Sequence, residues 1–202
     1  MDILEKFSNA RLPDDYFWLH KPDKFITGTG LEIWTMPQTD FWQRTHYGFR
    51  NDNGHCLLRE IEGDFCLTTQ VEFQPSALYD QSGLMLRVDE NNWIKVSTEY
   101  MKVGANKLGS VVTNQGYSDW ATQDISADVT MLWYRVSRRG QDFLIEASRD
   151  GVVWQQLRIC HLHEAFARIA AGVYACSPLE NSFWCRFEFL QFGPNQWQLE
   201  HH

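Results

Sequence analysis

The sequence predicts an all-β protein, an antiparallel sandwich of two sheets. Roughly a dozen short stretches alternate apolar and polar residues with a period of two, as half-buried strands do. Turn-forming pairs rich in Gly, Asn and Asp separate these stretches at regular intervals, and helical periodicity is almost absent. This combination is typical of sandwiches. Because one sandwich can exceed about 200 residues, we expect residues 1–198 to form a single domain and 199–202 to be an expression-tag remnant.

The first third of the chain is expected to hold short strands and one unusual loop. Residues 1–9 form either a short helix or an edge piece, and an apolar run follows at 16–20. The loop at 37–53 has no clean period and is dense in aromatic and hydrogen-bonding side chains. It is either a binding loop or a loop that folds back over a sheet. The expected hairpins are 25–28 with 31–36, and 56–62 with 65–74 across Gly63 and Asp64.

The clearest pattern lies between Tyr79 and Tyr100, where two long strands are expected to form a hairpin. Matching the apolar faces pairs Val88 with Ile94 and leaves a three-residue loop at 90–92. This register sets Arg87 opposite Lys95. Like charges in that position cost up to about 1 kcal/mol. We therefore expect an anionic group above them, either a carboxylate from a neighbouring strand or a ligand.

The second half continues the strand pattern. Residues 107–114 form a strand, followed by a polar and aromatic loop at 115–120. A hairpin of 131–138 with 143–148 places Arg135 opposite Glu146, a pair that neutralises itself. The remaining expected elements are a strand at 152–160, one helical turn at 165–170, and closing strands at 172–176 and 183–192.

Composition excludes several classes of function. The formal net charge of −8 argues against a nucleic-acid partner, which needs a basic surface. No stretch approaches the roughly 18 apolar residues of a membrane span, and the first twenty residues lack the apolar segment of a secretory signal. The five cysteines are scattered without a CxxC pair, which predicts buried free thiols in a reducing compartment, hence a cytoplasmic protein.

Several motifs in combination resemble one known family. They are Thr39–Gly48, Tyr79–Arg87, Asn92–Lys95, Val112–Asn114 with Tyr117–Trp120, and Ser148–Trp154. Together they resemble the regulation-of-enolase family, a domain of unknown function, over residues 18–192. The resemblance implies a concanavalin A-like lectin/glucanase fold, a jelly-roll sandwich of two antiparallel sheets. It implies no established activity or site.

The first functional hypothesis is a binding module for a carbohydrate or a small anionic sugar such as a sugar phosphate. Aromatic planes beside carboxylates, amides and cations are the groups that recognise sugars. The concave face is expected to present such groups, with Met85, Ser97, Trp133 and Arg135 alongside them. The expected ligand-binding residues are Arg87, Lys95, Glu99, Trp93, Asp80, Gln81, His46, Asp40, Tyr117, Asp119 and Trp120.

Two alternatives remain open. A glycoside hydrolase needs two carboxyl groups about 5–10 Å apart, for which Glu99, Asp80 and Asp119 are weak candidates. The Glu-x-Asp-x-x-Glu signature of laminarinase-type enzymes is absent from the sequence. A regulatory protein-interaction module would show an apolar patch on the convex face. No cofactor or metal site is expected, because His161-x-His163 and Asp89–Asn92 lack the spacing of metal ligands.

Overall fold

Two large antiparallel sheets make up the computed structural model, which describes residues 2–164 and 166–198. We refer to them as the eight-stranded sheet and the seven-stranded sheet. In spatial order the eight-stranded sheet contains β15 (Gln155–His161), β14 (Asp142–Ser148), β13 (Met131–Arg139), β8 (Phe65–Gln74), β17 (Trp184–Gly193), β4 (Leu31–Trp34) and β3 (Lys24–Ile26), and β1 (Ile3–Glu5) pairs with β17.

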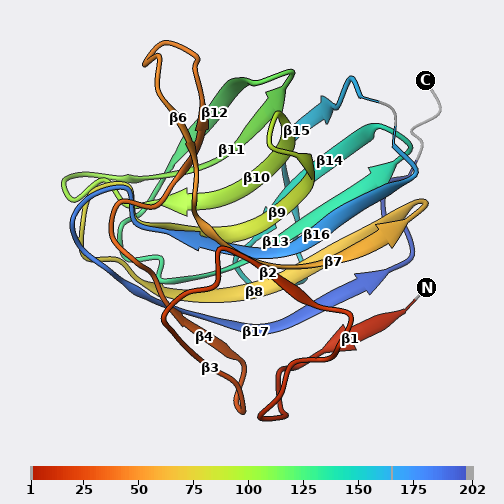
Figure 1. Ribbon diagram of the computed structural model, residues 1–202, viewed down its shortest axis with the longest axis horizontal. Coiled ribbons are helices and arrows are strands. Elements are labelled where there is room, and N and C mark those ends of the chain that lie inside the picture. Colours follow the sequence, from red (N-terminus) through yellow and green to blue (C-terminus); the bar gives the residue numbers. More distant parts are fainter. Residues whose placement is uncertain (1, 165, 199–202) are drawn as a thin grey trace.

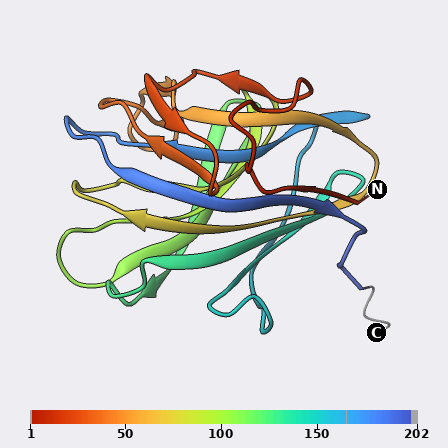
Figure 2. The ribbon, with the colours of Figure 1, turned by 90° about the horizontal axis from the view of Figure 1, so that it is seen from below.

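The seven-stranded sheet carries the candidate site on its outer face. Most of the short strands from the first fifty residues gather along one side of the sandwich (Figure 2). A separate two-stranded hairpin, β5 (Phe41–Gln43) with β6 (Arg50–Asp52), rises beside this sheet (Figure 1). The order of the seven strands is β12 (Tyr117–Ile125), β11 (Asn106–Asn114), β10 (Asn92–Glu99), β9 (Gln81–Asp89), β16 (Arg168–Cys176), β7 (His55–Glu62) and β2 (Phe17–Leu19).

The predicted fold class is confirmed: the protein is an all-β jelly-roll sandwich. Alternate residues of both sheets point inward and form one large apolar cluster, which includes Leu84, Leu86 and Val96. The hydroxyl groups of Tyr134 on β13 and Thr98 on β10 form a hydrogen bond of 2.8 Å across this core. The two sheets are thus joined by apolar packing and by a buried polar contact.

The register of the β9–β10 hairpin differs from the prediction by two residues. The structure pairs Arg87 with Trp93 and Lys95 with Met85, so the expected juxtaposition of Arg87 and Lys95 is wrong. The pairing shifts at a bulge between Asn92 and Trp93, so the connection is tighter than the expected three-residue loop. By contrast, the predicted register of β13 with β14 is confirmed. Arg135 and Glu146 form two hydrogen bonds of 2.7 and 2.8 Å.

Other predicted elements also differ from the structure. β7 and β8 do not form a hairpin, because the turn at Gly63 and Asp64 carries the chain from one sheet to the other. The segment expected to be a loop at 115–120 is mostly strand, since β12 begins at Tyr117. β16 begins at Arg168 within the expected helical turn, and Ala165 lies outside the described residues, as do 199–202. Trp133 and Arg135 belong to the eight-stranded sheet, not to the face expected to carry the site.

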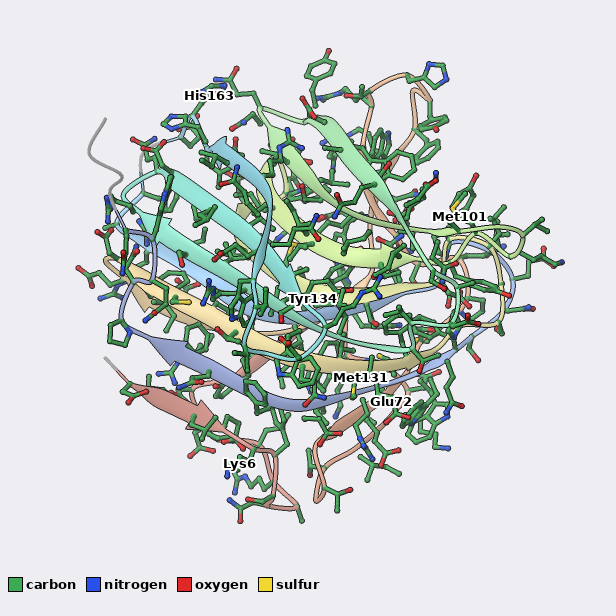
Figure 3. The ribbon with its side chains drawn as sticks, turned by 180° about the vertical axis from the view of Figure 1, so that it is seen from behind. Lys6, Glu72, Met101, Met131, Tyr134 and His163 are labelled. Carbon is green, nitrogen blue, oxygen red and sulfur yellow. The ribbon has the colours of Figure 1, made fainter. Side chains whose placement is uncertain are left out.

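The outer face of the eight-stranded sheet is dominated by ion pairs. Met131 and Glu72 are cross-strand neighbours on this sheet, and Figure 3 shows them side by side. Arg186 binds Glu72 at 3.1 Å, and Arg135 binds Glu146. The large apolar side chains exposed on this face come from four strands, none of which pairs with another of the four, so they are scattered over the sheet. They are Leu4, Ile26, Met131 and Ile159.

Candidate functional site

The β5–β6 hairpin covers part of the outer face of the seven-stranded sheet. Phe41 of β5 is fully buried against Trp93 and Tyr174, with ring centroids 6.0 and 6.2 Å away in edge-to-face geometry. A Cβ at Gly54 would lie 2.3 Å from the Phe41 ring, so only glycine fits where the chain leaves the hairpin. This packing forms a second apolar cluster that fixes the hairpin on the sheet.

Polar contacts hold the hairpin to two neighbouring turns. The Arg44 guanidinium donates to the Gly116 carbonyl at 2.9 Å, and the backbone N–H of Gln43 donates to Ser118 Oγ at 2.9 Å. Arg50 donates to Asn91 Oδ1 at 3.3 Å. These bonds reach both the β9–β10 and the β11–β12 turns, so the hairpin is fixed in place by contacts within the protein.

A pocket of about 340 Å³ lies between this hairpin and the sheet, which we call the aromatic pocket. Its volume falls in the range of roughly 300–1,000 Å³ that small-molecule sites occupy. Its floor is polar and its walls are mainly aromatic. The lining residues are Asp40, Trp42, Tyr47, Phe49, Asn51, Tyr79, Gln81, Lys95, Glu99, Trp120, Pro178 and Leu179.

Lys95 is a buried cation in the floor, and its ammonium group is fully engaged. It donates to Gln81 Oε1 at 2.8 Å, to the Phe41 carbonyl at 3.0 Å and to Asp40 Oδ1 at 3.5 Å. Burial lowers the pKa of Lys95, but Asp40, Cys176 and Glu99 together outweigh burial and leave this pKa above its usual value. The group therefore stays charged and has no ammonium hydrogen to spare for an additional anion.

Glu99 is the polar group of the floor that the protein leaves without a partner. It lies on β10, on the same face as Lys95, and is only 8% exposed. Within the described residues its carboxyl group forms no hydrogen bond, although it lines the pocket. Burial raises its pKa to about 7; Lys95 lowers this pKa and Asp40 raises it. A buried carboxyl that faces a pocket without a partner indicates a place for a ligand group.

A second hollow of about 510 Å³ adjoins the first, which we call the side groove. It shares Trp42, Tyr47 and Trp120 with the aromatic pocket, so these rings form the boundary between the two. The complete lining is Trp42, Thr45, His46, Tyr47, Tyr117, Ser118, Asp119 and Trp120.

The structure brings most, but not all, of the sequence-predicted site residues to these two hollows. Asp40, Gln81, Lys95, Glu99 and Trp120 line the aromatic pocket. The predicted residues that line the side groove are His46, Tyr117, Asp119 and again Trp120.

Three predicted site residues have internal partners and line neither hollow. Arg87 forms two hydrogen bonds of 2.6 and 2.7 Å with Asp52 of β6, so its counter-charge is a carboxylate of this protein. Trp93 is fully buried beneath Phe41. Asp80 is 1% exposed and accepts hydrogen bonds from Ser177 Oγ and from the amides of residues 76 and 77, each at 2.8 Å.

Several lining residues were not singled out from the sequence. Trp42, Tyr47 and Phe49 lie in the aromatic loop, but no periodicity distinguished them from the buried Phe41. Pro178 and Leu179 follow β16 in a segment with no signal of its own. For Tyr47 the sequence offered one clue, the position of this aromatic residue directly before Gly48.

The exposed aromatic side chains of the described residues are concentrated at this site. Five of the six line one of the two hollows, and Phe17 is the exception. The five are Tyr47, Phe49, Tyr79, Tyr117 and Trp120.

Two other kinds of site are absent from the part of the chain that the structure describes. It contains no cluster of three or more His, Cys, Asp or Glu residues arranged to hold a metal ion. It also contains no helix of the length and apolar character needed to cross a membrane.

The sandwich and its aromatic pocket define a jelly-roll β-domain with a ligand-sized pocket on the outer face of its seven-stranded sheet. The chain belongs to the family described as protein of unknown function (DUF1349), whose model matches residues 18–195. It is 34% identical over 162 residues to Regulation of enolase protein 1 of Saccharomyces cerevisiae, and the match covers 80% of each chain.

Solved structures support the same fold. A functionally unknown protein from Saccharomyces cerevisiae superposes with a TM-score of 0.78 at 30% identity, over 93% of this chain and 97% of that one. The GH43 protein BlXynB of Bacillus licheniformis matches with a TM-score of 0.75 at 18% identity, over 94% of this chain and 38% of that one. A xylan beta-1,4-xylosidase from Bacillus halodurans gives 0.74 at 13% identity, over 94% of this chain and 38% of that one. The chain thus resembles a part of these two proteins, and the likeness shows the fold alone.

Proposed function

We propose that the protein is a binding module for a neutral, hydroxyl-rich ligand of the carbohydrate class. The observation that carries this proposal is Glu99, a buried carboxyl without a partner at the base of an aromatic pocket. A sugar hydroxyl would complete its hydrogen bonding, and the walls at Tyr47, Phe49 and Trp120 would cover the apolar faces of a sugar ring.

The charges of the aromatic pocket favour a neutral sugar over a sugar phosphate. The expectation of an anionic ligand depended on Arg87 facing Lys95, and the observed register removes that basis. The aromatic pocket contains one cation, Lys95, and two carboxyl groups, Asp40 and Glu99. With the Lys95 ammonium already bonded to Asp40 and Gln81, an added phosphate would meet carboxylate repulsion and no free ammonium hydrogen.

We expect Trp120→Ala to weaken sugar binding by roughly tenfold, because an aromatic contact contributes about 0.5–1.5 kcal/mol beyond its buried area. Trp120 lines both hollows and is partly exposed, so its removal leaves the core intact. Calorimetric titration with glycans retained from a neutral-glycan array measures the effect.

Trp154→Ala is the matched control, since this indole packs on Arg135 on the other sheet, with the guanidinium 4.1 Å from its ring centroid. The affinity of the Trp154→Ala variant for the retained glycan should equal that of the wild type. If sugar phosphates bind and neutral sugars do not, the charge argument is wrong; if no glycan binds, the proposed function fails.

A glycoside hydrolase is the second candidate, and one observation favours it. Asp40 and Glu99 line the same pocket, and burial raises the pKa of Glu99 to about 7 while Asp40 is bonded to Lys95. Two carboxyl groups in unlike environments are what general acid catalysis of glycoside cleavage requires. Of the residues expected to be catalytic, Asp80 is engaged internally, and Asp119 lies in the side groove bound to Arg158 at 2.9 Å.

If the protein hydrolyses glycosides, Glu99→Gln should lower the rate by at least about a hundredfold, the contribution of a general acid. Hydrolysis of chromogenic aryl glycosides measures this rate. Glu60→Gln is the matched control, because Glu60 is exposed on β7 of the same sheet. Turnover that survives in Glu99→Gln at the wild-type rate removes Glu99 as the acid.

We also propose that this module acts in the cytoplasm. All five cysteines are free, and four of them are buried. This supports a reducing compartment, where thiols persist.

A protein partner is an alternative occupant of the aromatic pocket and the side groove, because the exposed aromatic side chains gather there and not on the eight-stranded sheet.

A further inference from the structure

The two hollows lie side by side and are separated only by side chains that line both. Trp42, Tyr47 and Trp120 face the aromatic pocket on one side and the side groove on the other. The Trp42 and Tyr47 rings are 5.6 Å apart in edge-to-face contact, so the boundary itself is a packed aromatic surface. A ligand bound in the aromatic pocket can therefore extend into the side groove and contact these rings in both hollows.

We infer that the ligand is a chain of at least two sugar units, with its terminal unit in the aromatic pocket and the next unit in the side groove. This inference rests on the proposed function and adds a second ligand position to it. The chemical class is a neutral oligosaccharide, bound at one end.

The side groove has the features of a ligand position in its own right. Tyr117 is 61% exposed, and the guanidinium of Arg44 lies 5.3 Å from its ring centroid, so the ring is held in place by the hairpin. Arg44 in turn is bonded to the Gly116 carbonyl. His46 supplies a hydrogen-bonding group beside this ring, and Asp119, which is paired with Arg158, also lines the groove. An exposed aromatic plane flanked by polar groups, held by the same contacts that fix the hairpin, suits a second sugar ring.

The two hollows also differ in depth, and this difference gives the bound oligosaccharide a direction. The aromatic pocket ends on a floor of buried groups, Lys95, Glu99 and Gln81, which would close around the end of a chain. The side groove is lined at its margin by the exposed His46, Tyr117 and Asp119. An oligosaccharide would thus begin at the floor of the aromatic pocket and continue through the side groove toward solvent.

The test compares the length dependence of binding in the wild type and in Tyr117→Ala. A neutral-glycan array identifies a retained sugar series, and calorimetry then measures the monomer, dimer and trimer of that series. We expect the wild type to bind the dimer or trimer roughly tenfold more tightly than the monomer, the effect of one further ring contact. Tyr117→Ala should remove this gain and leave the affinity for the monomer unchanged.

Phe17→Ala is the control, since Phe17 is the exposed aromatic residue that lines neither hollow, and it should behave as the wild type. Equal wild-type affinity for monomer and trimer overturns the second position while the proposed function stands. The second position is likewise overturned if Tyr117→Ala keeps the tighter binding of longer sugars, or if it weakens the binding of monomer and trimer equally. If no array glycan is retained by the wild type, both the inference and the proposed function fail.

Discussion

Replacing Glu99 with glutamine should stabilise the protein by about 3 kcal/mol at about pH 8 and change it little at about pH 5. Burial raises the pKa of Glu99 from its ordinary value of 4.5 to about 7. The folded state therefore holds a proton that the unfolded state releases. As the pH rises from about 4.5 to 7, the wild type loses stability at up to about 1.4 kcal/mol per unit, and above 7 the loss is complete. The glutamine side chain of the variant carries no titratable proton and avoids this loss.

Urea denaturation at the two pH values measures this difference in the free energy of unfolding. Glu60→Gln is again the control, because this exposed carboxyl on β7 should change stability by less than about 0.5 kcal/mol at either pH. A gain from Glu99→Gln that is as large at pH 5 as at pH 8 contradicts a protonated buried carboxyl. A loss of stability in Glu99→Gln at both pH values does the same.

Removing the carboxylate of Asp52 should destabilise the protein by about 3 kcal/mol. Arg87 is 11% exposed, and its two short hydrogen bonds to Asp52 tie the β6 strand to β9. Asp52→Ala leaves a largely buried guanidinium without a counter-charge and loosens the hairpin that forms the pocket wall. The double variant Asp52→Ala with Arg87→Met should recover more than about half of the loss, since it removes the unpaired charge.

Asp14→Ala provides the comparison, because Arg11 and Asp14 form an ion pair with side chains 87% and 90% exposed. Its effect should stay below about 0.5 kcal/mol. If Asp52→Ala costs no more than Asp14→Ala, Arg87 does not depend on Asp52, and a ligand role for this arginine would return.

The β9–β10 hairpin shows why sequence predicted faces but not register. Period-two alternation places Lys95 and Glu99 on the outer face correctly, because a residue's parity along the strand determines its side. A slip of two residues keeps every side chain on the same face, so matching apolar faces cannot detect it. The bulge at Asn92 produced such a slip. The β13–β14 hairpin has no bulge, and there the pattern and the register agree.

The candidate site was predictable in its residue types and not in its assembly. The aromatic loop was expected to be either a binding loop or a cover over the sheet, and the structure shows the cover: Phe41 is buried on the sheet, while Tyr47 and Phe49 stay exposed and line the aromatic pocket. Neighbouring aromatic residues give no local signal of which will be buried. Asp80 and Asp119 looked equivalent in sequence, yet Asp80 caps a turn and binds Ser177, whereas Asp119 binds Arg158. Both partners are distant in sequence, so local patterns could not reveal them.

The pocket walls depend heavily on one contiguous segment, residues 40–51, whereas the floor comes from strands of the sandwich. The scaffold and the pocket walls therefore come from different parts of the chain. Immunoglobulin domains are built in the same way, with binding loops carried on a rigid sandwich. Tyr47, Phe49 and Asn51 are exposed or half-buried, so changes there leave the core packing untouched. Randomising these three positions in a display library should therefore yield folded variants with altered ligand choice, and the jelly roll becomes a framework for grafting new specificities.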